Sequence, residues 1–227
     1  MLYLVPTPIG NLGDMTLRAV ETLKSVSAVY CEDTRRTRNL MTHFGISKPL
    51  FRYHEHHEEG SRRLLDRLKG GETLALVSDG GMPCVSDPGR RIVALARQEK
   101  IPVTALPGAN AATTALVGSG LPADSFIFLG FLPRSSSKRQ EALRQAAVLE
   151  KTLIVYESPF RVVEFLLDAE AALGPQAQVC AARELSKIHE EWLSGTVVGV
   201  RETLAARGSL MGEFVIVLHP KPRPNHE

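Results

Sequence analysis

The chain has 227 residues, a formal net charge of +2 and a hydrophobic fraction of 44%. This length allows one large domain or two small ones with packed cores. No apolar run approaches the roughly 20 residues that span a bilayer, and Leu2–Pro6 is too short for a signal peptide. Three widely spaced cysteines predict reduced thiols and a cytoplasmic protein. The near-neutral charge neither requires nor excludes a nucleic-acid partner.

The first half of the chain alternates apolar strands with amphipathic helices. Strands are expected at Leu2–Val5, Val26–Tyr30, Leu50–Tyr53, Thr73–Val77 and Val103–Leu106. Helices are expected after Asp14, over Thr34–Phe44 and Glu58–Lys69, and from Pro88, with Asp14 and Asp87 as N-caps. Strict alternation predicts an α/β fold with a mostly parallel sheet covered on both faces.

The second half has a different order of elements. Leu121–Asp124 is predicted as a boundary, which gives domains 1–120 and 121–227. Strands are expected at Phe126–Phe131, Leu153–Tyr156, Gln178–Arg183, Glu191–Thr196 and Glu213–His219, with helices over Ser137–Leu149 and Pro159–Leu173. Two strands in close succession imply antiparallel pairing, so a mixed sheet is predicted here.

Three loops that follow predicted strands contain glycine and proline. They are Pro6–Gly13, Ser78–Gly89 and Pro107–Asn110, the last of which opens a helix of small residues. Open α/β sheets bind ligands at the edge formed by the carboxyl ends of their strands, where these loops lie. Asp79 in the second loop can hydrogen-bond a ribose or an ammonium group. Pro6–Gly13 lacks the GxGxxG pattern, and an ordinary strand-to-helix turn explains it equally well.

Charged residues also follow several of the strands. Arg35, Arg36 and Arg38 come after the second strand, and Arg134, Lys138 and Arg139 lie beside the boundary. Each cluster alone can be explained as a solvent-exposed charged surface. Together the two clusters could form a basic rim around a cleft, where they would contact phosphates. Glu32, Glu157, Glu184 and Lys187 are candidates for acid–base chemistry, and surface ion pairs are the alternative interpretation.

Other kinds of site are disfavoured. His54–Glu59 matches no zinc spacing and is interpreted as a polar loop, so no metal is expected. A Gly-x-Ser-x-Gly elbow is missing, which disfavours a covalent hydrolase. A nucleotide-dependent oxidoreductase is disfavoured by the missing GxGxxG, and a non-catalytic RNA-binding protein would not need three glycine-bearing loops.

Eight segments in order resemble one family, the 16S ribosomal RNA (cytidine-2'-O)-methyltransferases of the tetrapyrrole methylase superfamily, over residues 1–219. These segments are Thr7–Asp14, Glu32–Arg35, Ser78–Gly89, Pro107–Gly108, Gly130–Arg134, Tyr156–Pro159, Ala182–Leu185 and Gly212–Phe214. Gly80, Met82 and Asn110 depart from the commoner family residues, which are alanine, threonine and a nearby serine.

The resemblance implies a homodimer of two-domain α/β chains, each with S-adenosylmethionine in the cleft between its domains. The implied cofactor contacts are Pro8, Asp79, Gly81, Met82, Asn110, Ala111, Tyr156, Ala182 and Gly212. The substrate would be small-subunit ribosomal RNA, with no metal and no membrane involved. The alternative within the superfamily is a methylase of a tetrapyrrole precursor, because the basic clusters suit tetrapyrrole carboxylates as well.

The expected reaction moves a methyl group from the sulfonium to a cytidine ribose 2'-hydroxyl. Alignment of the reacting atoms would supply about 7–11 kcal/mol of the rate enhancement. A base helps as the hydroxyl reacts; Glu184 is favoured, with Glu157, Glu32 and Lys187 as further candidates. Arg35, Arg36, Arg134, Lys138 and Arg139 are expected to contact RNA phosphates.

Overall fold

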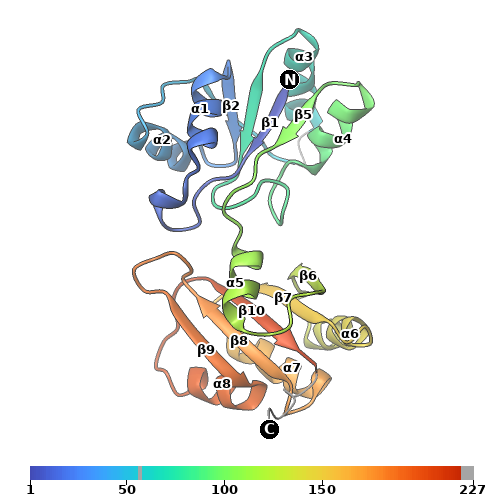
Figure 1. Ribbon diagram of the computed structural model, residues 1–227. Helices are drawn as coiled ribbons and strands as arrows, with labels where there is room; N and C mark the ends of the chain where they lie inside the picture. The colour runs from blue at the N-terminus through green and yellow to red at the C-terminus, as the bar shows by residue number, and fades with distance from the viewer. Residues whose placement is uncertain (56–57, 221–227) are drawn as a thin grey trace. The chain divides into compact units, whose positions relative to one another are not determined.

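The computed structural model describes residues 1–55 and 58–220, and its elements fall into two units, Met1–Asn110 and Ala111–Glu227 (Figure 1). The sequence-based boundary at 120/121 lies one helix later. Helix α5 (Ala111–Ser119) falls in unit 2 because it packs against three strands of that unit, β7, β8 and β10. Within the described ranges no helix combines the length and apolarity that crossing a bilayer requires.

Unit 1 contains an entirely parallel five-stranded sheet, which confirms the predicted parallel arrangement. The strands are β1 (Leu2–Val5), β2 (Ala28–Cys31), β3 (Leu50–Arg52), β4 (Leu74–Val77) and β5 (Val103–Ala105), in the order β3-β2-β4-β1-β5. Both β1 and β4 lie inside the sheet, and their side chains are buried on both faces apart from the partly buried Tyr3.

Helices cover both faces of this sheet. They are α1 (Leu17–Ser25), α2 (Thr34–His43), α3 (Glu58–Lys69) and α4 (Arg90–Gln98), preceded by a short 3-10 helix, η1 (Leu12–Asp14). Figure 1 shows α1 and α2 on one side of the sheet and α3 and α4 on the other. Two apolar clusters result, one containing Leu23 and Met41 and the other containing Leu64 and Ile92.

Two expected N-caps in unit 1 are wrong. Asp14 ends η1, and α1 is capped instead by Thr16, whose hydroxyl accepts a hydrogen bond from Ala19 N at 3.1 Å. Helix α4 begins at Arg90 with Gly89 as its N-cap, so Asp87 lies outside the helix. Asp14 therefore belongs to η1, and Asp87 belongs to the loop that precedes α4.

Unit 2 contains the mixed sheet that the sequence predicts. Its strands are β6 (Phe126–Phe131), β7 (Thr152–Glu157), β8 (Gln178–Arg183), β9 (Glu191–Thr196) and β10 (Phe214–His219), in the order β6-β7-β10-β8-β9. Strands β6 and β7 are parallel, and the other pairs are antiparallel. The fold class expected from the sequence is therefore confirmed.

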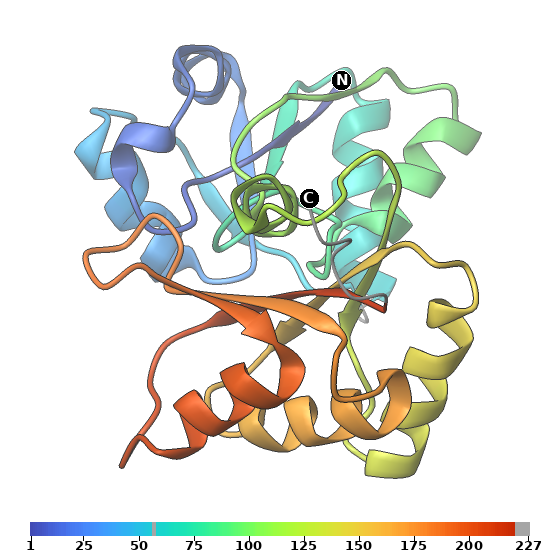
Figure 2. The same ribbon diagram turned by 60° about the horizontal axis from the view of Figure 1, so that its bottom comes forward.

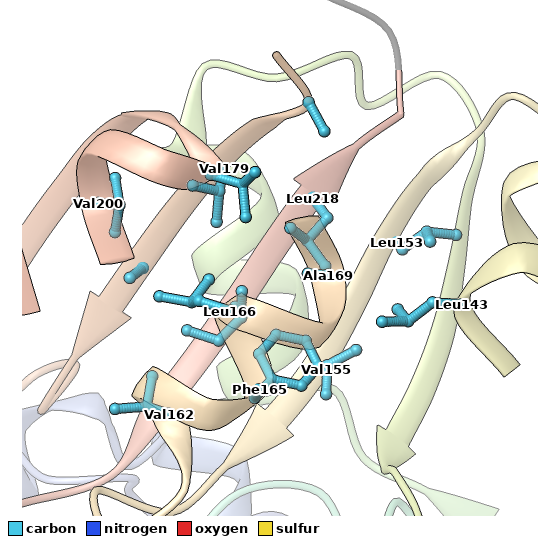
Figure 3. Close-up of a cluster of buried hydrophobic side chains, with 14 of the residues drawn as sticks. Leu143, Leu153, Val155, Val162, Phe165, Leu166, Ala169, Val179, Val200 and Leu218 are labelled. Carbon is cyan, nitrogen blue, oxygen red and sulfur yellow. The ribbon is translucent and has the colours of Figure 1, made fainter. Parts of the chain in front are cut away.

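The two faces of this sheet are covered differently. Helices α6 (Ser136–Ala147), α7 (Val162–Leu173) and α8 (Val197–Ala205) lie along one face (Figure 2). Their core includes Leu143, Phe165 and Val200 (Figure 3). On the other face α5 packs closely, because a Cβ at Gly118 would collide with the indole ring of Trp192.

A buried ion pair joins α6 to α7. The Arg139 side chain is fully buried, and its Nε donates to Asp168 Oδ2 at 2.6 Å while Nη2 donates to Glu164 Oε1 at 2.8 Å. Burial opposes the Arg139 charge, but these hydrogen bonds outweigh it and raise the guanidinium pKa. The expectation that Arg139 contacts RNA phosphates is therefore wrong, since its charge is enclosed within unit 2.

We expect Arg139→Met to lower the free energy of unfolding by about 3–5 kcal/mol, because Asp168 would remain buried without its cation. The double variant Arg139→Met/Asp168→Leu should recover most of that loss. Arg144→Met, on the exposed side of the same helix, is the control and should change stability by about 0.5 kcal/mol or less. Urea unfolding measures all three, and a double variant no more stable than Arg139→Met would contradict this account.

Candidate functional site

Four loops meet at the carboxyl edge of the sheet in unit 1. They follow β1, β2, β4 and β5, and parallel strands place their carboxyl ends at one edge. Because β4 lies between β1 and β2, its loop, which begins at Ser78, is flanked by the loops of both neighbours. The edge therefore collects Pro8, Asp79, Gly81 and Asn110, as the sequence predicts.

The loops after β1 and β4 are joined by hydrogen bonds. Thr7 N donates to Gly81 O at 3.0 Å, and Gly81 N donates to Thr7 O at 2.9 Å. The Thr7 hydroxyl donates to Ser78 O at 3.0 Å, and the Ser78 hydroxyl donates to Gly81 O at 2.5 Å. Both hydroxyl-bearing side chains are buried, so these bonds fix the shape of the edge.

Glycine is required where these loops pack against each other. Gly81 has φ +89°, a conformation that L side chains rarely adopt, and its Cβ position lies 3.3 Å from Ile9 Cγ2. At Gly108 a Cβ would lie 2.8 Å from the Cβ of Pro6. Glycine at these two positions therefore allows the loops of the edge to pack closely against one another.

Asp79 lies at the centre of the edge and has two neighbours. Its Oδ1 accepts a hydrogen bond from Asp33 N at 3.1 Å, and its Oδ2 lies 3.8 Å from Arg36 Nη1. Beside it a cleft of about 330 Å³ is lined by residues of the β1 loop, α2 and the β4 loop: Thr7, Pro8, Gly10, Leu12, Arg36, Thr37, Asn39, Leu40, Ser78 and Asp79.

Asp87 is a site residue whose environment the sequence does not reveal. Burial, together with the nearby charges of Glu32 and Asp79, raises its pKa to about 6. Across the described residues its carboxylate has neither a hydrogen bond nor an ion pair. Three carboxylates from the loops after β2 and β4 therefore lie close together at this edge.

Glu55 performs the capping that the sequence assigns to Asp87. One carboxylate oxygen accepts from Gly89 N, and the other accepts from Arg91 N at 2.7 Å, at the start of α4. Glu55 belongs to the polar segment His54–Glu59, of which His56 and His57 lie outside the described residues. Elsewhere in the described chain, no group of three or more His, Cys, Asp or Glu side chains could hold a metal ion.

The expected cofactor contacts in unit 2 are aligned across its sheet. Tyr156 on β7 and Ala182 on β8 both pair with Val215 on β10, so the three residues share one face. The Tyr156 ring makes edge contacts with Phe128 and Phe131, at centroid distances of 5.0 and 5.6 Å. Tyr156 and Ala182 thus lie on the face opposite the α6–α8 core, which contains Val155 and Ala181.

Glu184 and Lys187 hold the ends of β8 and β10 together. Glu184 Oε1 accepts from Lys187 Nζ at 2.7 Å and from Glu213 N at 2.9 Å. Burial opposes the charge of Glu184, but these hydrogen bonds outweigh it and lower its pKa. The Lys187 pKa is raised by the same carboxylate and by Glu213, despite burial. A carboxylate and an ammonium group held in this way are poor proton acceptors.

The remaining candidates have different surroundings. Glu157 is buried, accepts from Ser158 N at 2.7 Å and lies 3.2 Å from Arg161 Nη2. Arg35 is exposed and binds Asp33 through two nitrogen atoms, at 3.3 and 3.0 Å. Arg134 and Lys138 are exposed at the start of α6. The carboxylate of Glu32 is half-buried and has no hydrogen bond or ion pair to any residue that the structure describes.

Comparison with known proteins relates this chain to methyltransferases. The profile described as Tetrapyrrole (Corrin/Porphyrin) Methylases matches residues 1–199. A protein named Ribosomal RNA small subunit methyltransferase I from Halalkalibacterium halodurans is 48% identical over 218 residues, which cover 96% of this chain and 75% of that protein. A protein of the same name from Hydrogenobaculum is 45% identical and is covered to 94% of its length.

Solved structures share the fold at low sequence identity. Diphthine synthase superposes with a TM-score of 0.72 at 16% identity, covering 98% of this chain and 91% of that one. Uroporphyrin-III C-methyltransferase from Thermus thermophilus, solved with S-adenosylhomocysteine, gives a TM-score of 0.64 at 22% identity, with coverages of 95% and 96%. These likenesses support the architecture described above.

We expect Asp87→Asn to stabilise the protein above neutral pH. The folded-state pKa of about 6 exceeds the ordinary value of 3.8, so the folded state loses stability as the pH rises between these values. After allowance for solvent screening, the gain should be about 1 kcal/mol at about pH 8 and should vanish at about pH 4. Asp124→Asn, at an exposed position, is the control. Unfolding curves with no pH-dependent difference would contradict this assignment.

Proposed function

The chain belongs to the tetrapyrrole methylase family, and on that premise we propose that it methylates a cytidine ribose 2'-hydroxyl in small-subunit ribosomal RNA, using S-adenosylmethionine. The observation that carries the RNA substrate is the 42–48% identity to proteins named Ribosomal RNA small subunit methyltransferase I, over 96–100% of this chain. The cytidine and the 2'-oxygen come from the motif resemblance. The same resemblance implies a cytoplasmic homodimer. Analytical sedimentation at several protein concentrations tests the oligomeric state.

A tetrapyrrole substrate is the weaker alternative. The structures whose names refer to uroporphyrin or precorrin substrates are 15–22% identical to this chain, which supports a common fold and nothing finer. The exposed arginines that could meet tetrapyrrole carboxylates serve equally well for phosphates. The higher identity to the ribosomal RNA enzymes therefore decides between the two substrates.

The edge of unit 1 fits the cofactor chemically. Glu32, Asp79 and Asp87 place negative charge where a sulfonium would be favoured. We assign Pro8, Asp79, Gly81, Met82 and Asn110 to cofactor binding in unit 1, and Ala111, Tyr156, Ala182 and Gly212 in unit 2. S-adenosylmethionine supplies an activated methyl group, and these residues would orient it toward the ribose oxygen.

Glu32 is the best-placed acceptor for the hydroxyl proton. Its carboxylate lies near that of Asp87 at the carboxyl edge, and it forms no ion pair with any described residue. Glu184, which the sequence favours, is engaged by Lys187 and Glu213. Glu157 lies against Arg161. The exposed Arg35, Arg36, Arg134 and Lys138 are assigned to RNA phosphates.

The experiment that tests this function incubates the protein with radiolabelled S-adenosylmethionine and unmethylated small-subunit ribosomal RNA. Methylation of a ribose 2'-hydroxyl blocks alkaline cleavage at the following phosphodiester, because cleavage requires that hydroxyl. Label in the RNA together with one protected linkage after a cytidine supports the proposal. Label on a base, or transfer only to a tetrapyrrole, would refute it.

We expect Asp79→Asn to weaken S-adenosylmethionine binding by about 1–3 kcal/mol, since a charged acceptor would be lost from the edge. The substituted amide keeps the shape of the side chain, so the thermal unfolding midpoint should change little. Calorimetry measures the affinity, and Asp66→Asn on the exposed face of α3 is the control. Equal affinities of both variants and the parent would remove Asp79 from the cofactor site.

We expect Glu32→Gln to slow methyl transfer on the order of 100-fold in single turnovers, with unchanged cofactor affinity, because the proton acceptor would be lost. Glu184→Gln should instead lower the unfolding midpoint, because it weakens the pairing with Lys187. Glu21→Gln, exposed on α1, is the control for a lost charge. A Glu32→Gln rate within about threefold of the parent, with a slow Glu184→Gln, would return the role to Glu184.

A further inference from the structure

The cleft beside Asp79 contains side chains that the cofactor assignment does not use. Arg36, Asn39 and Leu40 lie at positions i, i+3 and i+4 of α2 and therefore share one face of the helix. Pro8, from the loop after β1, and Leu12, from η1, also line the cleft. The volume of about 330 Å³ lies within the range of small-molecule pockets.

The polar groups of this face are available to a ligand. The side chain of Arg36 is 71% exposed, and its ion pair with Asp79 is loose at 3.8 Å. The Asn39 amide is exposed and hydrogen-bonds to nothing in the described parts of the chain. An exposed guanidinium suits a phosphate, and a free amide offers a donor and an acceptor to the edge of a base.

The apolar groups complete a surface suited to a flat ring. Leu12 is 42% exposed, and Leu40 and Pro8 are half-buried. Apolar contact, an amide and a cation at some distance match the faces of a base, its edge and the phosphate of a nucleotide. Sequence-specific proteins bind RNA mainly through unstacked bases whose edges they hydrogen-bond.

We infer that the cleft holds one unstacked nucleotide of the RNA, with its base between Leu12 and Leu40, its edge on Asn39 and its phosphate on Arg36. This inference rests on the proposed function and specifies where the substrate is recognised. Because Asp79 borders both this cleft and the cofactor site, the bound nucleotide would lie next to the cofactor. Arg36 and Asn39 then act in substrate recognition and take no part in cofactor binding.

The test uses the full chain with Arg36→Gln and Asn39→Ala, and a short single-stranded oligoribonucleotide containing cytidine as the probe. Affinity is measured by fluorescence anisotropy over a range of salt concentrations. Arg36→Gln should reduce the slope of log affinity against log salt by about 0.7, the value for one phosphate contact to a single strand. Asn39→Ala should lower the affinity roughly 5- to 150-fold at every salt concentration and leave the slope unchanged.

Two control variants accompany these measurements. Arg62→Gln removes an exposed arginine from α3, which covers the opposite face of the sheet, and Thr42→Ala shortens an exposed side chain of α2 outside the cleft. Both should bind RNA as the parent does. All four variants should retain the parent's unfolding midpoint, since each changes an exposed side chain.

Three results would overturn the inference. One is a salt slope for Arg36→Gln equal to that of Arg62→Gln, and another is an Asn39→Ala affinity equal to that of Thr42→Ala. The third is a loss of S-adenosylmethionine affinity in Arg36→Gln and Asn39→Ala, which would assign the cleft to the cofactor. Methyl transfer by the parent protein to ribosomal RNA distinguishes the proposed function from the proposed nucleotide cleft. If the parent transfers no methyl group, the proposed function is refuted. If it does, but Arg36→Gln and Asn39→Ala bind RNA as the controls do, only the assignment of the cleft is refuted.

Discussion

The backbone pairing of Thr7 with Gly81 is the contact on which the site in unit 1 depends. Strands β1 and β4 are paired as far as Val5 and Val77, and their loops then leave the sheet. Two backbone hydrogen bonds and the buried Thr7 hydroxyl keep these loops together beyond the last strand residues, and the Ser78 hydroxyl braces the β4 loop by donating to Gly81 O. Pro8 and Asp79 both line the cleft at this edge, and glycine adopts the φ of +89° at position 81 without the strain that a side chain would add.

The sequence predicts the elements well where the pattern is local. Leu2–Val5, Glu58–Lys69, Phe126–Phe131 and Gln178–Arg183 have the expected bounds, because buried strands and amphipathic helices leave clear apolar patterns. The sequence pattern does not predict helix α8. This helix follows β9 without an intervening loop, so no turn residues separate the strand from the helix, and Gly199 in its first turn is a weak helix former.

The roles of single side chains were harder to predict, because their partners are distant in the sequence. Asp87 is followed by proline and so matches an N-cap pattern, yet Glu55, 34 residues before Gly89, supplies the cap. Arg139 belongs to a basic run, yet it is buried against Asp168, 29 residues later. Composition reveals that these charges exist, whereas only the packing of α4 and α6 determines which of them reach solvent.

A common architecture does not by itself select a substrate. The structures named for uroporphyrin, precorrin and diphthine chemistry have the same fold at 15–22% identity to this chain. Helix α2 follows the β2 loop at the carboxyl edge of unit 1 and carries Arg36 and Asn39 on the face toward the cleft.

Two carboxylates in series connect this helix to the β4 loop. Asp79 Oδ1 accepts from Asp33 N, and Asp33 Oδ1 accepts from Arg35 N at 2.8 Å, which caps the first turn of α2. Hydrogen bonds from Arg35 lower the pKa of Asp33 to about 2, so this cap stays charged at neutral pH. Asp33 thus joins the β4 loop to the first turn of α2 through hydrogen bonds on both of its sides. Asp79, which borders the proposed nucleotide cleft and is assigned to the cofactor, is therefore hydrogen-bonded to the N-cap of the helix that carries Arg36 and Asn39.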